Sequence, residues 1–310
     1  MRRKRPDGYA EGNMAHRNVF ARAAGLAASF LAALLMTAGG AGAFDESKYP
    51  DLKGQWRRAE RGDIAGGFGG LRYDATKPPL LGQEAPLTPE YQAIYEANLA
   101  DQAAGGQGIE STFTCLSPGM PRVMLAYAPM EVVVTQDTTY ILMEHIHDNR
   151  RIHTDGRGFP DTMDDDPQFS GYSIGKWVDE DGDGRYDVLM VETRGLKGPR
   201  TYDASGIPFH RDNKTVIRER IFVDRADRNL LHDEITTIDN ALTRPWVVTR
   251  NYHRVVTDKP IWWREDVCAE NNAHVGIGGE SYYLSADGLL MPAKKNQAPP
   301  DLRYFRPYDR

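Results

Sequence analysis

Apolar and polar residues alternate along much of the chain after Pro129. Short runs rich in β-branched and aromatic residues are bounded by Gly, Pro, Asn and Asp, which predicts β-strands joined by turns. We expect eight such strands, at residues 131–135, 139–147, 151–154, 172–178, 186–193, 215–223, 232–238 and 246–256. Strands at this spacing are typical of an antiparallel barrel or sandwich. The predicted fold is therefore mainly β, an antiparallel β-barrel.

The pattern before residue 129 predicts the entry into a first strand near Trp56, and one helix. Thr88 is a suitable helix cap, Pro89 suits the first helical position, and apolar residues recur at helical spacing until Gly105. The proline-rich segment 75–88 lacks a hydrophobic period and is expected to form an extended surface loop. The tail, residues 292–310, is expected to wrap the body. Residues 44–310 would then form a single β-rich domain.

The first 43 residues have the features of a secretory signal peptide. An uncharged apolar run follows Arg22 and precedes Ala41-Gly42-Ala43, the small-x-small pattern that signal peptidase accepts. Met14 begins a leader of ordinary proportions and is the expected true start. The apolar run is shorter than the roughly 20 residues that span a bilayer. We expect cleavage near Ala43 and Phe44, and a periplasmic or secreted protein without membrane insertion.

Charge and motifs narrow the classes of partner. The formal net charge is −6, and the leader holds more basic than acidic residues, so the rest of the chain is more acidic still. This balance argues against nucleic acid as a partner. The sequence contains no phosphate-binding loop, Gly-x-Ser-x-Gly elbow or His-Glu-x-x-His motif, and no nucleotide cofactor is expected. Nothing in the sequence indicates the oligomeric state.

The chain has two cysteines, Cys115 and Cys268. In an oxidising compartment a disulfide between them is the first interpretation, and two buried thiols are the alternative.

The sharpest motif is an acidic loop that precedes a predicted strand. Asp179, Asp181, Asp183 and Asp187 occupy relative positions 1, 3, 5 and 9, with Gly184 at position 6. This spacing directs alternate carboxylates toward one point, as calcium requires. Met190 stands at position 12, so the loop is not an EF-hand. We predict a structural calcium ion on a β-hairpin loop, and a solvated acidic turn is the alternative.

A second cluster consists of His145, His147 and His153. If a three-residue turn joined two strands here, His145 would lie opposite His153, and the three imidazoles would share one face. Such a face could bind zinc or another transition metal. A hydrogen-bonded or solvated histidine patch is the preferred interpretation.

Three predicted strands carry one carboxylate each on an otherwise apolar face, namely Glu144, Glu192 and Glu219. A carboxylate buried in a cavity has a raised pKa that suits acid–base chemistry. Arg250, which shares a strand face with Trp246, is the expected partner. On this interpretation Glu219→Gln would change stability little, because an unpaired buried charge is removed. Alternatively, some of these faces are solvent-exposed.

Several stretches resemble a large group of exported, uncharacterised bacterial β-rich (lipocalin-like) proteins. They begin at Cys115 (Cys-Leu-Ser-Pro-Gly-Met-Pro-Arg), Arg151 (Arg-Ile-His-Thr-Asp-Gly-Arg), Gly171 (Gly-Tyr-Ser-Ile-Gly-Lys-Trp), Val191 (Val-Glu-Thr) and Thr243 (Thr-Arg-Pro-Trp). The resemblance covers most of the chain from Gly54 onward, and Gly54-x-Trp56 is similar to the first-strand signature of lipocalins. The resemblance to this group implies that the acidic loop is an insertion. The group tends to carry Tyr at the positions of His145 and His153, so the resemblance leaves Glu144, His147, Asp155 and Arg157 as the better site candidates.

These observations predict a barrel that handles a small, partly apolar molecule, by binding it or as a lyase, hydratase or isomerase using carboxylate and histidine chemistry. The alternative is a non-catalytic ligand-binding, structural or interaction protein of the cell envelope. A cavity lined by the candidate residues would favour a barrel that handles a small molecule. A filled apolar core would favour a structural or interaction protein. The catalytic candidates are Glu144, His147, Asp155, Arg157 and Glu219, and the expected ligand contacts are Tyr140, Glu192, Trp246 and Arg250.

Overall fold

The computed structural model describes residues 44–58, 85–125, 128–145, 149–198, 200–265, 267–268, 273–278 and 280–301. The predicted signal peptide, most of the proline-rich segment, His147 and the end of the tail lie outside these residues. The chain divides into two compact units, Met1–Asp45 and Glu46–Arg310, and all elements described below belong to the second.

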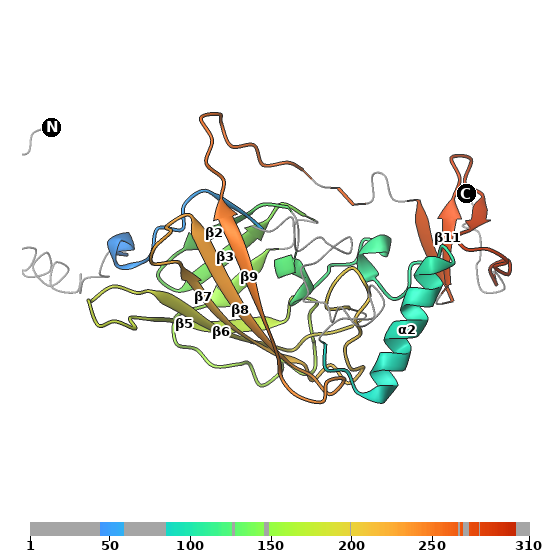
Figure 1. The fold of residues 1–310 in the computed structure, drawn as a ribbon, viewed down its shortest axis with the longest axis horizontal. Coiled ribbons are helices and arrows are strands. Elements are labelled where there is room, and N and C mark those ends of the chain that lie inside the picture. Colours follow the sequence, from blue (N-terminus) through green and yellow to red (C-terminus); the bar gives the residue numbers. More distant parts are fainter. Residues whose placement is uncertain are drawn as a thin grey trace, which may run out of the picture. The chain divides into compact units, whose positions relative to one another are not determined.

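Nine strands close into a barrel in the order β1 to β9, which confirms the predicted mainly β barrel (Figure 1). Lipocalin barrels have eight up-and-down strands, so this barrel differs from them in strand number. The strands are β1 (Gln55–Arg58), β2 (Met130–Val134), β3 (Thr138–Met143), β4 (Arg150–His153), β5 (Tyr172–Val178), β6 (Val188–Arg194), β7 (Val216–Val223), β8 (Leu230–Ile238) and β9 (Trp246–Arg254).

The alternation of side chains along each strand fills the barrel. In β8, for example, every second residue from Leu231 to Thr237 is buried, while the residues between them are half-exposed. This is the period of two that a strand with one buried face requires. The interior is closed by Leu52, which precedes β1, and by Met124 from the short 3-10 helix η4 (Arg122–Leu125).

One neighbouring pair in the otherwise antiparallel barrel is parallel, which the sequence pattern did not indicate. Strands β4 and β5 run in the same direction with Ile152 opposite Ser173. Parallel neighbours cannot be joined by a tight turn, so the chain returns along residues 154–171 before it enters β5.

The hairpin between β3 and β4 differs from the predicted one. His153 lies opposite Thr138, not opposite His145. Strand β3 ends at Met143 and β4 begins at Arg150, so the connection is longer than the three residues assumed for the histidine face. The His153 ring instead stacks on Tyr172, with 4.9 Å between ring centroids.

The predicted helix is confirmed as α2 (Pro89–Ala103). The Thr88 hydroxyl accepts a hydrogen bond from the Tyr91 amide at 3.5 Å, and Pro89 occupies the first turn. Tyr95 contributes to a second apolar cluster, which also contains Trp246 from β9. Within the described part of the chain, no helix is long and apolar enough to cross a membrane.

The predicted disulfide between Cys115 and Cys268 is confirmed, with Cα atoms 5.5 Å apart. Cys115 ends the 3-10 helix η3 (Ser111–Thr114), and Cys268 precedes a three-stranded sheet. The hydrophobic pattern of the sequence predicts no strands there. The sheet consists of β10 (His274–Ile277), β11 (Glu280–Leu284) and β12 (Leu290–Pro292).

Candidate functional site

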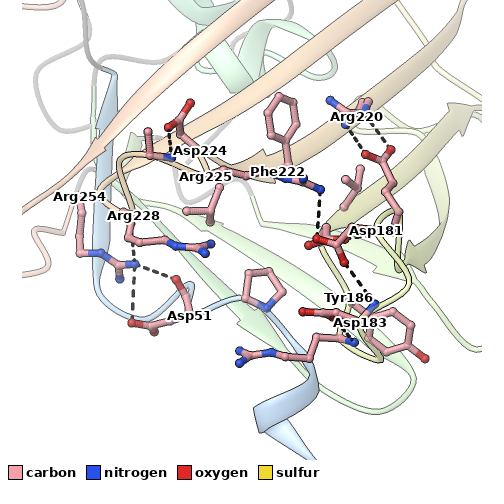
Figure 2. Close-up of a pocket in the computed structure, with 17 residues that line it drawn as sticks. Asp51, Asp181, Asp183, Tyr186, Arg220, Phe222, Asp224, Arg225, Arg228 and Arg254 are labelled. Carbon is pink, nitrogen blue, oxygen red and sulfur yellow. Dashed lines mark hydrogen bonds and ion pairs between the residues drawn. The ribbon is translucent and has the colours of Figure 1, made fainter.

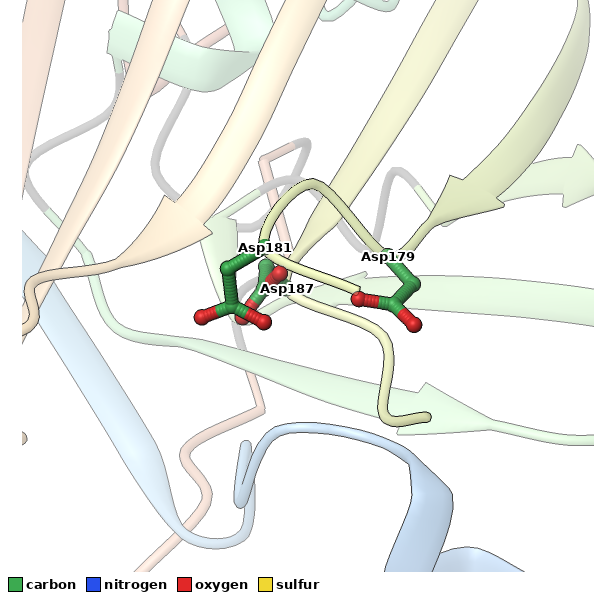
Figure 3. Close-up of side chains that lie close together, drawn as sticks. All are labelled: Asp179, Asp181 and Asp187. Atoms are coloured by element: carbon green, nitrogen blue, oxygen red, sulfur yellow. The ribbon is translucent and has the colours of Figure 1, made fainter. Parts of the chain in front are cut away.

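The acidic loop connects β5 to β6 and brings three of its carboxylates together. One oxygen from each of Asp179, Asp181 and Asp187 lies within 4.8 Å of the others (Figure 3). The loop is shaped by its own side chains, since Asp179 accepts hydrogen bonds from the amides of Gly182 at 2.7 Å and Gly184 at 2.9 Å. Oxygen ligands at this spacing are suited to a hard cation. The sequence therefore identified a cluster that could hold a metal ion.

Asp183 was also predicted as a metal ligand, but it is not part of this trio. Its carboxylate accepts a hydrogen bond from the amide of Arg185 at 2.8 Å. This hydrogen bond closes a turn in the part of the acidic loop that leads into β6.

The acidic loop forms one wall of a pocket with a volume of about 1030 Å³. The pocket, called here the mouth pocket, lies at the barrel end where β5, β7 and β9 terminate and β1 begins. Figure 2 shows that the turn between β7 and β8 forms the opposite wall. The mouth pocket is lined by Pro50, Asp51, Glu180, Asp181, Asp183, Arg185, Tyr186, Asp187, Val188, Arg220, Phe222, Val223, Asp224, Arg225, Ala226, Arg228 and Arg254.

Ion pairs connect the walls of the mouth pocket. Arg220 on β7 binds Glu180 of the acidic loop at 2.7 Å, and Arg225 of the β7–β8 turn lies 3.3 Å from Asp181 (Figure 2). The acidic loop is thus held against the neighbouring turn at this barrel end.

The barrel interior contains a buried layer of charged residues. Arg150 and Glu219 form a bidentate ion pair, with N–O distances of 2.9 and 2.7 Å, and their side chains are 1% and 0% exposed. Burial alone would lower the pKa of Arg150, but the adjacent Glu219 carboxylate raises it. Glu219 therefore faces the interior, as predicted, but its partner is Arg150, not Arg250.

Asp233 completes this layer without a direct partner. It is fully buried opposite Arg250 on β9, yet neither of its carboxylate oxygens has a hydrogen-bond partner among the described residues. Burial and the charge of Glu219 raise its pKa well above the usual value, although Arg150 and Arg250 oppose the shift. The layer therefore favours the neutral form of Asp233.

Next to this charged layer, apolar side chains fill the barrel interior. The cavity that Asp233 lines has a volume of only about 10 Å³, which is room for about one water molecule. Its other walls are Leu52, Met124, Met130, Val132, Ile141, Trp177, Leu189, Ile221, Leu231 and Tyr252. A filled core argues against a ligand inside the barrel.

We expect Asp233 to make stability fall as pH rises. Because its folded pKa is raised, its contribution is fully present below the unfolded pKa and is lost as pH rises through the folded value. Asp233→Asn should remove that loss, so the variant should gain stability relative to the parent at alkaline pH. Urea unfolding at a series of pH values measures this difference. Asp161→Asn, at an exposed position, is the control, and equal pH profiles for Asp233→Asn and the parent would refute the assignment.

Glu144, Asp155 and Arg157, the other catalytic candidates that the structure describes, are not brought together with Glu219. Glu144 is buried at the opposite barrel end from the mouth pocket, after β3, with 8% of its surface exposed. Asp155 and Arg157 form an exposed ion pair after β4, in which hydrogen bonds from Arg157 lower the pKa of Asp155 to about 2. A carboxylate held in this way is a weak base.

The expected ligand contacts are also dispersed. Glu192 lies on the outer surface in ion pairs with Arg194 and Arg218, and Tyr140 is half-buried below Arg151. Trp246 packs on Tyr202, with ring centroids 4.3 Å apart, at the far barrel end. Arg250 is fully buried in the charged layer.

Sequence reasoning missed Arg150, Asp233 and the arginines of the mouth pocket. Asp233 offered a signal, since it stands between Leu231 and Ile235 on the same strand face. No pattern in the sequence pointed to Arg150, because the register of β4 in the barrel determines which residue it pairs with.

No protein-family profile matches the chain, and no curated protein matches it in sequence.

Proposed function

We propose that the protein is an exported small-molecule-binding module whose ligand occupies the mouth pocket, beside a calcium ion held by Asp179, Asp181 and Asp187. The proposal is carried by the position of Asp181 and Asp187, two of the three clustered carboxylates, in the wall of a ligand-sized hollow. The hollow of about 1030 Å³ lies near the upper end of the roughly 300–1,000 Å³ typical of ligand sites.

Export is supported by two independent features. The disulfide between Cys115 and Cys268 fits an oxidising compartment. The leader in the sequence has the organisation of a signal peptide.

Binding is favoured over catalysis by the placement of the ionisable groups. Acid–base catalysis needs a base within hydrogen-bond reach of the reacting atom. Glu219 is committed to Arg150, and Glu144 and Asp155 lie at different places on the barrel. The lyase, hydratase or isomerase interpretation therefore has less support than a binding role.

A structural or interaction role in the envelope is the second candidate, and the filled barrel core is the observation that was expected to favour it. After β9 the chain exposes Val256, Ile261, Trp262 and Val267, and Trp262 is 81% exposed. Exposed apolar groups of this kind are common at protein interfaces.

Calcium is expected to raise the melting temperature. At a concentration of about 100 times the dissociation constant, binding to the folded state adds roughly 2.7 kcal/mol, and loops of this kind bind with dissociation constants on the order of 10⁻⁴ to 10⁻³ M. The double variant Asp179→Asn, Asp181→Asn should lose the shift, because two of the three clustered ligands are gone. Differential scanning calorimetry with calcium, magnesium or chelator makes the measurement.

Asp183→Asn is the matched control, since it removes a carboxylate of the same loop that is outside the trio. It should keep most of the calcium shift. No shift in the parent would leave the loop as an acidic turn. Native mass spectrometry of protein purified from its host tests the ligand itself, and a protein free of any small molecule would count against a binding role.

A further inference from the structure

Five arginines line the mouth pocket, and they differ in their partners. Arg220, Arg225 and Arg254 each have a carboxylate within 4.0 Å, namely Glu180, Asp181 and Asp51. Arg185 and Arg228 have no ion-pair partner among the residues that the structure describes. Two guanidinium groups in the same pocket are therefore available to a ligand.

These two arginines come from opposite walls. Arg185 lies within the acidic loop, between Asp183 and Asp187, and Arg228 belongs to the β7–β8 turn and points into the pocket in Figure 2. The backbone on each side is held in place. The Arg185 amide donates to Asp183, and Asp224 accepts hydrogen bonds from the amides of Ala226 and Asp227, both at 2.8 Å.

A guanidinium group presents N–H donors in a planar fork that matches a carboxylate, sulfate or phosphate. The carboxylates of the acidic loop would repel a ligand's oxyanion, but a divalent cation in the trio offsets their charge. An oxyanion placed between Arg185 and Arg228 would thus meet two donors and a neutralised wall.

We propose that the mouth pocket recognises a small molecule through an oxyanion group bound by Arg185 and Arg228. This inference rests on the proposed function, in that it takes the mouth pocket as the ligand site. It adds the chemical class of the ligand.

The test compares pairs of probes that differ only in charge. Methyl glucuronoside and methyl glucoside are titrated into the full chain at low ionic strength with calcium present, with NMR or calorimetry as the readout. Sodium sulfate and inorganic phosphate form separate arms that distinguish a carboxylate site from a site for other oxyanions. We expect at least one oxyanion to bind and the neutral glucoside not to bind.

Each of Arg185→Met and Arg228→Met should weaken oxyanion binding by about tenfold or more, the usual effect of losing a hydrogen bond to a charged group. Arg228→Lys should weaken it less, because the charge is kept. Arg57→Met removes an exposed arginine of β1 outside the pocket, and should leave the affinity unchanged. Circular dichroism and the melting temperature confirm that the variants are folded.

The outcomes separate the two proposals. If the glucoside binds as tightly as the glucuronoside, the pocket remains a ligand site and the oxyanion inference is wrong. If oxyanions bind equally to Arg57→Met and to both pocket variants, or if none binds the parent, the inference is also overturned. A calcium shift in melting temperature without oxyanion binding leaves the calcium proposal standing alone.

Discussion

Glu219→Gln is expected to reduce the free energy of unfolding by about 3–5 kcal/mol, the usual cost of breaking a buried ion pair. The substitution leaves the Arg150 guanidinium inside the barrel, where only 1% of its side chain is exposed, with a neutral amide in place of its counter-charge. This reverses the expectation from sequence alone that the same substitution would change stability little. Urea denaturation at neutral pH measures the effect.

Two further variants separate the charge from the packing. Glu192→Gln, on the outer surface between Arg194 and Arg218, should cost only about 0–1 kcal/mol, as exposed ion pairs do. Replacing both buried partners, with Arg150→Met and Glu219→Leu, should recover much of the lost stability because no charge is left unpaired. A loss below about 1 kcal/mol for Glu219→Gln alone would contradict the buried pair.

Removing the disulfide should have an effect of similar size. Cys115 and Cys268 are 153 residues apart, and the chain-entropy model gives about 5 kcal/mol for a loop of this length, with roughly 2–5 kcal/mol lost in practice when a native disulfide is removed. The double variant Cys115→Ser, Cys268→Ser should therefore unfold at a lower urea concentration than the parent.

A reductant provides the control for this experiment. Dithiothreitol should bring the parent to the stability of the double variant and should not affect the double variant itself. Before reduction, the unfolded parent should show no titratable thiol. Two free thiols in the oxidised protein would show that the bond does not form in solution.

Local patterns were sufficient for much of the fold. The alternation along β8 and the capping signals at Thr88 predicted a strand and a helix that the structure contains, because each depends on residues close in sequence. The strands β10 to β12 were missed, since they are short and only β11 buries an aromatic residue, Tyr282.

The candidate site could be predicted only where its members are neighbours in sequence. Asp179, Asp181 and Asp187 lie within one loop, so their spacing was informative. The ion pair between Arg150 and Glu219 joins residues on β4 and β7, which are not adjacent in the barrel. Its geometry depends on the register of every strand between them, and no local pattern contains that information.

The parallel pairing of β4 and β5 has a consequence for how the barrel assembles. Successive hairpins can form from local contacts, but this pair needs the chain to return along residues 154–171 first, and its ladder has only two residue pairs. Strands β1 and β9 must also meet across most of the domain, with Trp56 opposite Arg254. Such distant contacts form slowly because the loop entropy is lost before they stabilise the chain. We expect the two arcs of sequentially paired antiparallel strands, β2 to β4 and β5 to β9, to fold as separate cooperative units. The β4–β5 seam should then be the first to exchange its amide hydrogens when the native barrel opens.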